Sequence, residues 1–162
     1  MMLGMSGETF TVVHVIISLI GIASGMVVLY AMIEGRPPGG WTTLFLATTV
    51  ATSLTGFMFP ISGLTPAHVV GAISLAVLAV ALFALYGRVL AGPWRAIYVI
   101  SAVAALDLNV FVGVVQAFQK LPPLQNLAPT QSEPPFLVAQ TVVLAVFAVL
   151  GLMAVKRYRT SA

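Results

Sequence analysis

Residues 10–33 read FTVVHVIISLIGIASGMVVLYAMI and contain no charged side chain. An α-helix needs about 20 consecutive apolar residues to cross the hydrocarbon core of a bilayer. Four more apolar runs of roughly this kind follow, at about 42–59, 67–90, 96–118 and 136–155. Clusters of proline and glycine separate the runs, and such clusters end helices. The sequence therefore predicts an all-α, polytopic membrane helix bundle with about five transmembrane helices.

The overall composition supports the same interpretation. Of the 162 residues, 60% are hydrophobic and only 7% are charged. Soluble domains carry about a quarter charged residues, so this chain has too few to cover a water-exposed surface. We expect one transmembrane domain over residues 1–162, with the lipid bilayer as its solvent. The absence of cysteine excludes disulfides, thiolate metal sites and cysteine nucleophiles.

The basic residues predict the orientation of the helices. If the N-terminus lies outside, six basic residues fall in cytoplasmic segments and only Lys120 falls outside. This asymmetry follows the positive-inside rule and predicts an N-out, C-in topology. The basic residues are scattered at the ends of apolar runs instead of forming a stripe, so they do not indicate a nucleic-acid partner. The six are Arg36, Arg88, Arg95, Lys156, Arg157 and Arg159.

Polar side chains gather at one predicted depth in the outer leaflet. A helix rises about 1.5 Å per residue. On that scale every predicted span places one polar side chain within about two turns of the outer boundary. The two histidines in this layer are the best candidates for a site. The layer consists of His14, Thr55, His68, Gln116 and Gln140.

Two histidines at matched depth suggest a cofactor site. His14 and His68 could ligate a b-type haem from its two sides, with Gly21, Gly25 and Gly71 leaving room for the macrocycle. This hypothesis requires the first and third helices to be neighbours with both rings turned inward. The alternative for these glycines is a helix-packing seam.

A quinone headgroup would suit the same layer, with the histidines as donors and Gln116 and Gln140 orienting the ring. A transition metal held by His14 and His68 is a further possibility, although the ligand set is thin.

The fourth predicted helix carries polar groups on two faces. Asn109, Gly113 and Gln116 share one face, and Asp107 points to nearly the opposite side. An acid inside a membrane is costly and needs a reason. Asp107 could relay protons or coordinate a cation. Alternatively it is a neutral acid bonded to a neighbouring helix, for which the threonine-rich second helix is the candidate.

Other functional classes remain open. The chain could be an accessory or assembly subunit of a larger membrane complex, or self-associate, without a cofactor of its own. Its proline-rich segment between residues 121 and 135 could dock a partner. A small oligomeric channel or transporter is a third class, with Asp107 or the Thr48, Thr52 and Thr55 stripe lining the path. No catalytic motif is present, so no residue is assigned a catalytic role and enzymatic activity stays undecided.

Two resemblances accompany these interpretations. Residues 109–120 (NVFVGVVQAFQK) and 127–136 (LAPTQSEPPF) resemble a group of small uncharacterised bacterial multi-helix inner-membrane proteins. That resemblance implies a bacterial inner membrane and carries no mechanism. Residues 66–86 more loosely resemble helices of b-type cytochrome-like membrane proteins, in which a histidine opens a helix and a glycine follows. Those cytochromes usually carry several intramembrane histidines and this chain has two, so at most one bis-histidine haem could form.

Overall fold

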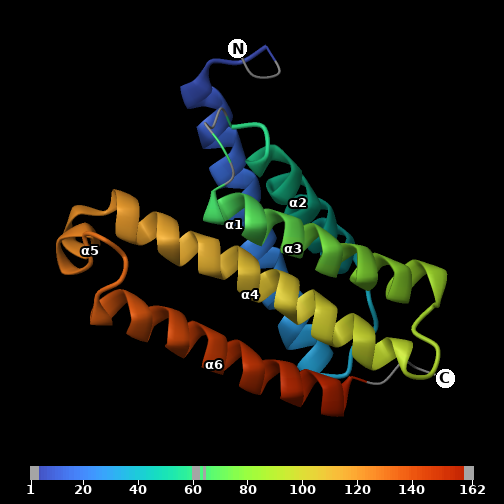
Figure 1. The fold of residues 1–162 in the computed structure, drawn as a ribbon. Coiled ribbons are helices and arrows are strands. Elements are labelled where there is room, and N and C mark those ends of the chain that lie inside the picture. Colours follow the sequence, from blue (N-terminus) through green and yellow to red (C-terminus); the bar gives the residue numbers. More distant parts are fainter. Residues whose placement is uncertain (1–3, 60–62, 64, 159–162) are drawn as a thin grey trace.

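The structure, a computed structural model, describes residues 4–59, 63 and 65–158 (Figure 1). No strand occurs within these ranges, and the predicted all-α class is confirmed. The elements in chain order are α1 (Gly7–Ile33), α2 (Gly40–Gly56), α3 (Pro66–Leu82), the π-helical turn η1 (Phe83–Gly87), α4 (Trp94–Lys120), α5 (Pro122–Leu127) and α6 (Pro134–Arg157).

Four helical segments are long and apolar enough to cross a membrane, so the chain has the make-up of a multi-pass integral membrane protein. They match four of the five predicted spans, and α2 is not among them. With 17 residues, α2 is about 25 Å long, less than the roughly 30 Å hydrocarbon core. The four segments are Gly7–Ile33, Pro66–Gly87, Trp94–Lys120 and Pro134–Arg157.

Local chemistry sets where the helices begin. Ser6 caps α1, because its hydroxyl oxygen accepts the Thr9 amide proton at 3.2 Å. Helices α3 and α6 each have proline in the first turn, where the missing amide donor costs nothing. Between α4 and α6 the expected loop contains a short helix, α5, which starts on Pro122 and Pro123 for the same reason.

The helices pack around α4. Helix α1 contacts α2, α4 and α6, while α3 contacts α2 and α4. Figure 1 shows α3, α4 and α6 side by side, with α1 and α2 crossing them. In its most apolar window 44% of α4 is buried, against 11% of α6, so α4 lies in the middle and α6 at the edge. The core along α4 includes Tyr98, Val99, Ala102, Ala105 and Leu106.

Helices α1 and α2 pair antiparallel along most of α1. Close to Gly25 lies the Phe45 ring, and close to Gly21 lie the Thr48 and Thr49 hydroxyls. Farther toward the start of α1, His14 bonds Thr55, and Phe10 packs edge-on against Phe59 with ring centroids 5.0 Å apart. Residue numbers in these contacts fall along α1 as they rise along α2 and the residues after it, which is the register of an antiparallel pair.

Gly25 permits the closest approach in this pair. A methyl group on Gly25 would lie 2.6 Å from Leu106 Cδ1 and 2.9 Å from the Phe45 ring. We expect Gly25→Ala to lower the free energy of unfolding by about 1–3 kcal/mol, because the core has no room for the methyl group. Unfolding of the purified protein in mixed micelles by a denaturing detergent measures the change.

Gly113→Ala is the matched control, since its methyl group would meet only Ile22 Cδ1 at 3.7 Å. Alanine favours a helix over glycine by up to about 1 kcal/mol, so this variant should be as stable as the parent or slightly more so. Equal destabilisation by both substitutions would contradict the packing argument.

The turn between α5 and α6 is organised by Glu133. Its carboxylate accepts hydrogen bonds from the Thr130 hydroxyl at 2.7 Å and from the backbone amides of Thr130 and Ser132, each at 3.1 Å. These bonds, led by the one from the Thr130 side chain, lower the pKa of Glu133. The carboxylate therefore stabilises the turn only while it is ionised.

The stabilisation by Glu133 should depend on pH in a defined direction. Because its pKa is lowered on folding, the contribution is complete above the ordinary glutamate pKa and is lost as pH falls through the folded value. Glu133→Gln should accordingly speed amide hydrogen exchange at Thr130 and Ser132 at neutral pH. After correction for intrinsic exchange, variant and parent should converge in strong acid, and a pH-independent difference would argue against this role.

Candidate functional site

The His14 ring is held by α2. Its Nδ1 lies 2.7 Å from Thr55 Oγ1, and the Thr55 hydroxyl gives its own proton to the Ala51 carbonyl at 2.7 Å. When the Thr55 proton lies on that carbonyl, Thr55 accepts from the ring, and this pattern predicts that Nδ1 of a neutral His14 carries the proton. The ring also packs edge-on against Phe59, with centroids 5.2 Å apart. His14 and Thr55, two members of the predicted layer, are thus brought together.

The His68 ring caps its own helix. The Thr65 amide donates to His68 Nδ1 at 3.1 Å, and the Thr65 hydroxyl lies 2.9 Å from the same atom. In the neutral ring Nδ1 is therefore an acceptor and the proton sits on Nε2. The ring packs against Phe57, with centroids 5.5 Å apart. The hydrogen-bond pattern therefore predicts opposite tautomers for the two histidines.

The residues that directly follow α2 lie against both histidine rings. Phe59 packs on His14 and Phe57 packs on His68, and the Phe57 ring also lies 3.1 Å from the position of a methyl group on Gly71. A haem ligand binds through an imidazole lone pair, usually on Nε2, with the other nitrogen donating. Only His14 has that form. The arrangement gives the two-histidine haem or metal site no support, and it stays a prediction.

The glycines assigned to a cofactor slot are in contact with other side chains. At Gly25 the space holds Leu106 and Phe45, and at Gly21 it holds Asn109, Thr48 and Thr49. Gly113 faces Ile22 of α1. Within the described chain these glycines let α1 approach α2 and α4, which is the packing alternative that the sequence left open.

Asn109 forms a polar contact in the core that the sequence did not pair. It is 7% exposed, and its Oδ1 accepts a hydrogen bond from the Ser18 hydroxyl of α1 at 3.0 Å. Its Nδ2 is buried and has no hydrogen-bond partner among the described residues. Ser18 could have been found from the sequence, because helical spacing puts it on the same side of α1 as His14, Gly21 and Gly25. Its partner could not, because that depends on which helix packs there.

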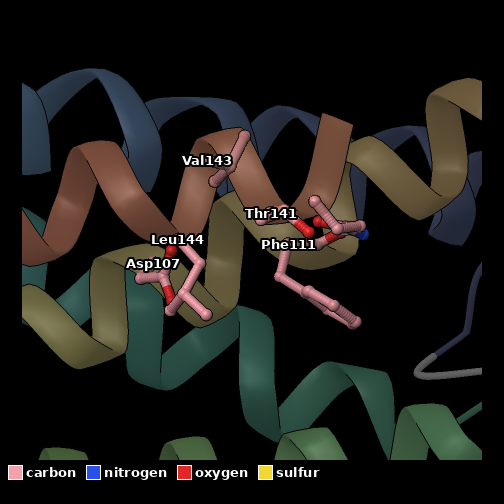
Figure 2. Close-up of a pocket in the computed structure, with 6 residues that line it drawn as sticks. Asp107, Phe111, Thr141, Val143 and Leu144 are labelled. Carbon is pink, nitrogen blue, oxygen red and sulfur yellow. Dashed lines mark hydrogen bonds between the residues drawn. The ribbon is translucent and has the colours of Figure 1, made fainter. Parts of the chain in front are cut away.

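A shallow hollow between α4 and α6 contains Asp107. Its lining residues are Asp107, Phe111, Gln140, Thr141, Val143 and Leu144. Figure 2 shows Asp107 beside Leu144, and Phe111 beside Thr141 farther along the hollow. Asp107 lies halfway along α4. It faces α6, because residues of α6 line the same hollow. The threonine-rich helix α2, the neighbour considered from sequence, does not line this hollow. Its Thr48, Thr49 and Thr52 hydroxyls donate to carbonyls of α2 itself.

The polar atoms of this hollow are hydrogen-bond acceptors. Gln140 uses its Nε2 to donate to the Phe111 carbonyl at 3.1 Å, and its buried Oε1 has no partner among the described residues. The Thr141 hydroxyl proton goes to Leu137 at 2.7 Å, which leaves its oxygen as an acceptor. Within the described ranges no hydrogen bond reaches the Asp107 carboxyl. A group that donates hydrogen bonds would complement the Asp107 carboxyl and the Thr141 oxygen, whereas Gln140 Oε1 is closed off from the outside of the bundle.

The remaining predicted site residues are spread over the bundle. Gln116 is exposed on α4, and Gln140 lies on α6 in the Asp107 hollow. Neither of them lies in the contacts made by the two histidine rings. Among the described residues, no group of three or more histidine and acidic side chains is placed to hold a metal ion. Neither histidine lines the Asp107 hollow or the hollow between the start of α2 and η1.

Comparison with known proteins gives no further assignment: no family model, no curated protein and no solved structure matches this chain.

The opposite histidine tautomers are directly testable. Nitrogen-15 spectra of imidazole-labelled protein at alkaline pH should show His14 protonated on Nδ1 and His68 protonated on Nε2. Thr55→Val removes the acceptor of His14 and should shift only the His14 signals toward the Nε2 form, which free imidazole side chains prefer. Identical tautomers for the two rings, or no response to Thr55→Val, would contradict the hydrogen-bond assignment.

Proposed function

We propose that this protein is a five-helix membrane subunit, N-out and C-in, that associates laterally with a helix of a larger membrane complex through its α4–α6 face. The observation that carries the proposal is the polar hollow around Asp107, halfway along α4, which opens between α4 and the sparsely buried helix α6. This is the accessory-subunit class of function. It requires no cofactor and no chemistry by the chain itself.

The pairing of α2 with α1 supports a fifth crossing. Phe45 of α2 lies at Gly25, and Thr55 lies at His14 near the other end of α1. The residues after α2 continue to Phe59, which packs on Phe10. From Phe10 to Gly25 α1 rises about 22 Å. The segment from α2 to Phe59 therefore runs back along most of the depth that α1 crosses.

The distribution of charge supports the orientation. Near the end where α1 and α6 finish and α4 begins, the described basic residues are Arg36, Arg88, Arg95, Lys156 and Arg157. The opposite end has one basic residue, Lys120, and the acids Glu8 and Glu133. The positive-inside rule favours the first end as the cytoplasmic one, and this supports the N-out, C-in part of the proposal.

The α4–α6 face is the surface that most needs a partner. Along α6 only Phe147 and Ala154 are buried, while Leu144, Val149 and Leu152 are each at least 58% exposed. Lipid covers such apolar residues without cost. It cannot hydrogen-bond Asp107, because hydrocarbon offers no hydrogen-bond donors. A neighbouring helix that carries a serine, threonine, amide or basic side chain could donate a hydrogen bond to Asp107.

Photo-crosslinking in native membranes tests this proposal. A photoreactive residue in place of Leu144 should give a cross-link to another membrane protein, and the attached peptide should carry a donor side chain. Asp107→Leu should weaken that cross-link about tenfold, since interhelical hydrogen bonds in membranes contribute roughly 1–2 kcal/mol. Asp107→Asn, which still hydrogen-bonds, should retain most of it.

The same probe at Ile73 on α3, which is also exposed, serves as the control and should label lipid. Cross-links from position 144 to lipid alone would overturn the proposal. A cross-link to a second copy of the chain would replace the larger complex with self-association.

A further inference from the structure

Helix α6 packs closely against the bundle along its second half. Its buried residues are Phe147 and Ala154, and Tyr158, which directly follows the helix, is buried as well. Helical spacing puts these three side chains on one face of α6. On the same face Gly151 lies against α4, since a methyl group there would be 3.2 Å from Val103 Cγ1. No residue of α6 before Phe147 is buried, so close packing is confined to the second half.

The first half of α6 is fastened to α4 by two glutamine side chains. Gln140 Nε2 donates to the Phe111 carbonyl at 3.1 Å. In the turn before α6, Gln131 Nε2 donates to the Val115 carbonyl at 3.2 Å. The two carbonyls are about one turn apart along α4. At the start of α6 the Phe136 ring adds an edge-on contact with α4.

Breaking these contacts would leave few groups without partners. A carbonyl inside an α-helix already accepts the amide proton of the residue four positions further on, so both carbonyls of α4 keep a hydrogen bond when the glutamines leave. Along the first half of α6, Leu137, Val138 and Val142 are each at least 53% exposed. Lipid tails cover such apolar side chains as well as a protein helix does. Segments with so few buried contacts are the ones that open locally.

We propose that residues 131–146 form a flap that swings away from α4 about the packed second half of α6, and that the two glutamine bonds keep this flap closed. The hollow lined by Asp107, Phe111 and Gln140 lies between the flap and α4. Opening therefore widens the access to Asp107 and uncovers Gln140 Oε1, which is buried without a described partner in the closed form. A group that donates hydrogen bonds to these oxygens binds the open form more tightly and increases its population.

Distances between paired spin labels test the flap in the full-length protein. The chain has no cysteine, so two introduced cysteines carry the only labels. One pair, Val69→Cys with Val138→Cys, joins the first halves of α3 and α6, and the other, Val80→Cys with Leu152→Cys, joins their second halves. All four positions are exposed, and α4 lies between the two labelled helices (Figure 1).

The measurement is made by pulsed electron–electron resonance in lipid nanodiscs that contain no other protein. The second-half pair should give one distance, and the first-half pair should give a main distance and a longer minor one. Gln131→Leu with Gln140→Leu should increase the longer component about fivefold, as expected for the loss of weak interhelical hydrogen bonds. It should leave the second-half pair unchanged, which also shows that the fold is intact.

Gln116→Leu with Gln125→Leu is the matched control, because both glutamines are exposed and neither side chain has a hydrogen bond among the described residues. It should reproduce the distances of the parent. An unchanged first-half distance in the Gln131 and Gln140 variant would overturn the proposal, and so would equal broadening of both pairs. Because the flap is a property of the chain alone, a failed cross-link from position 144 would leave it standing.

Discussion

Hydrocarbon offers no hydrogen-bond partners, and this constraint governs the structure from its helices to its surfaces. Each polar side chain in the membrane must bond within the protein or find a partner outside it. The threonines of α2 return their protons to carbonyls of their own helix. His14 uses Thr55 and Ser18 uses Asn109, so the α1–α2–α4 interior is largely satisfied.

These hydrogen bonds change the interpretation of His14 and His68. His14 bonds Thr55 and packs on Phe59, whereas the Thr65 amide bonds His68, which packs on Phe57. Histidines used in this way fix helix ends and helix pairs. The buried side-chain atoms without a hydrogen-bond partner among the described residues are Gln140 Oε1 beside the α4–α6 hollow, Asn109 Nδ2 in the core, and the hydroxyls of Tyr98 and Tyr158.

The bundle thus has two kinds of surface through which it could act in a membrane. The α4–α6 face offers the Asp107 carboxyl and the Thr141 oxygen in a hollow between two apolar helices. The end of the bundle that carries Arg36 and Arg88 offers exposed cations, and each of these two is stacked on an aromatic ring. The two surfaces differ in charge and lie on different elements.

The sequence by itself determined the helical class and the approximate bounds of the helices, because hydropathy, prolines and caps are local properties of the chain. It also placed Asn109 and Asp107 on opposite faces of α4, since helical periodicity decides that. It could not decide which helix meets each face. Only the tertiary structure brought Ser18 to Asn109 and α6 to Asp107, and occupied the Gly25 notch with Phe45 and Leu106. Helix neighbours depend on how side chains of distant segments fit together, and no single segment carries that information.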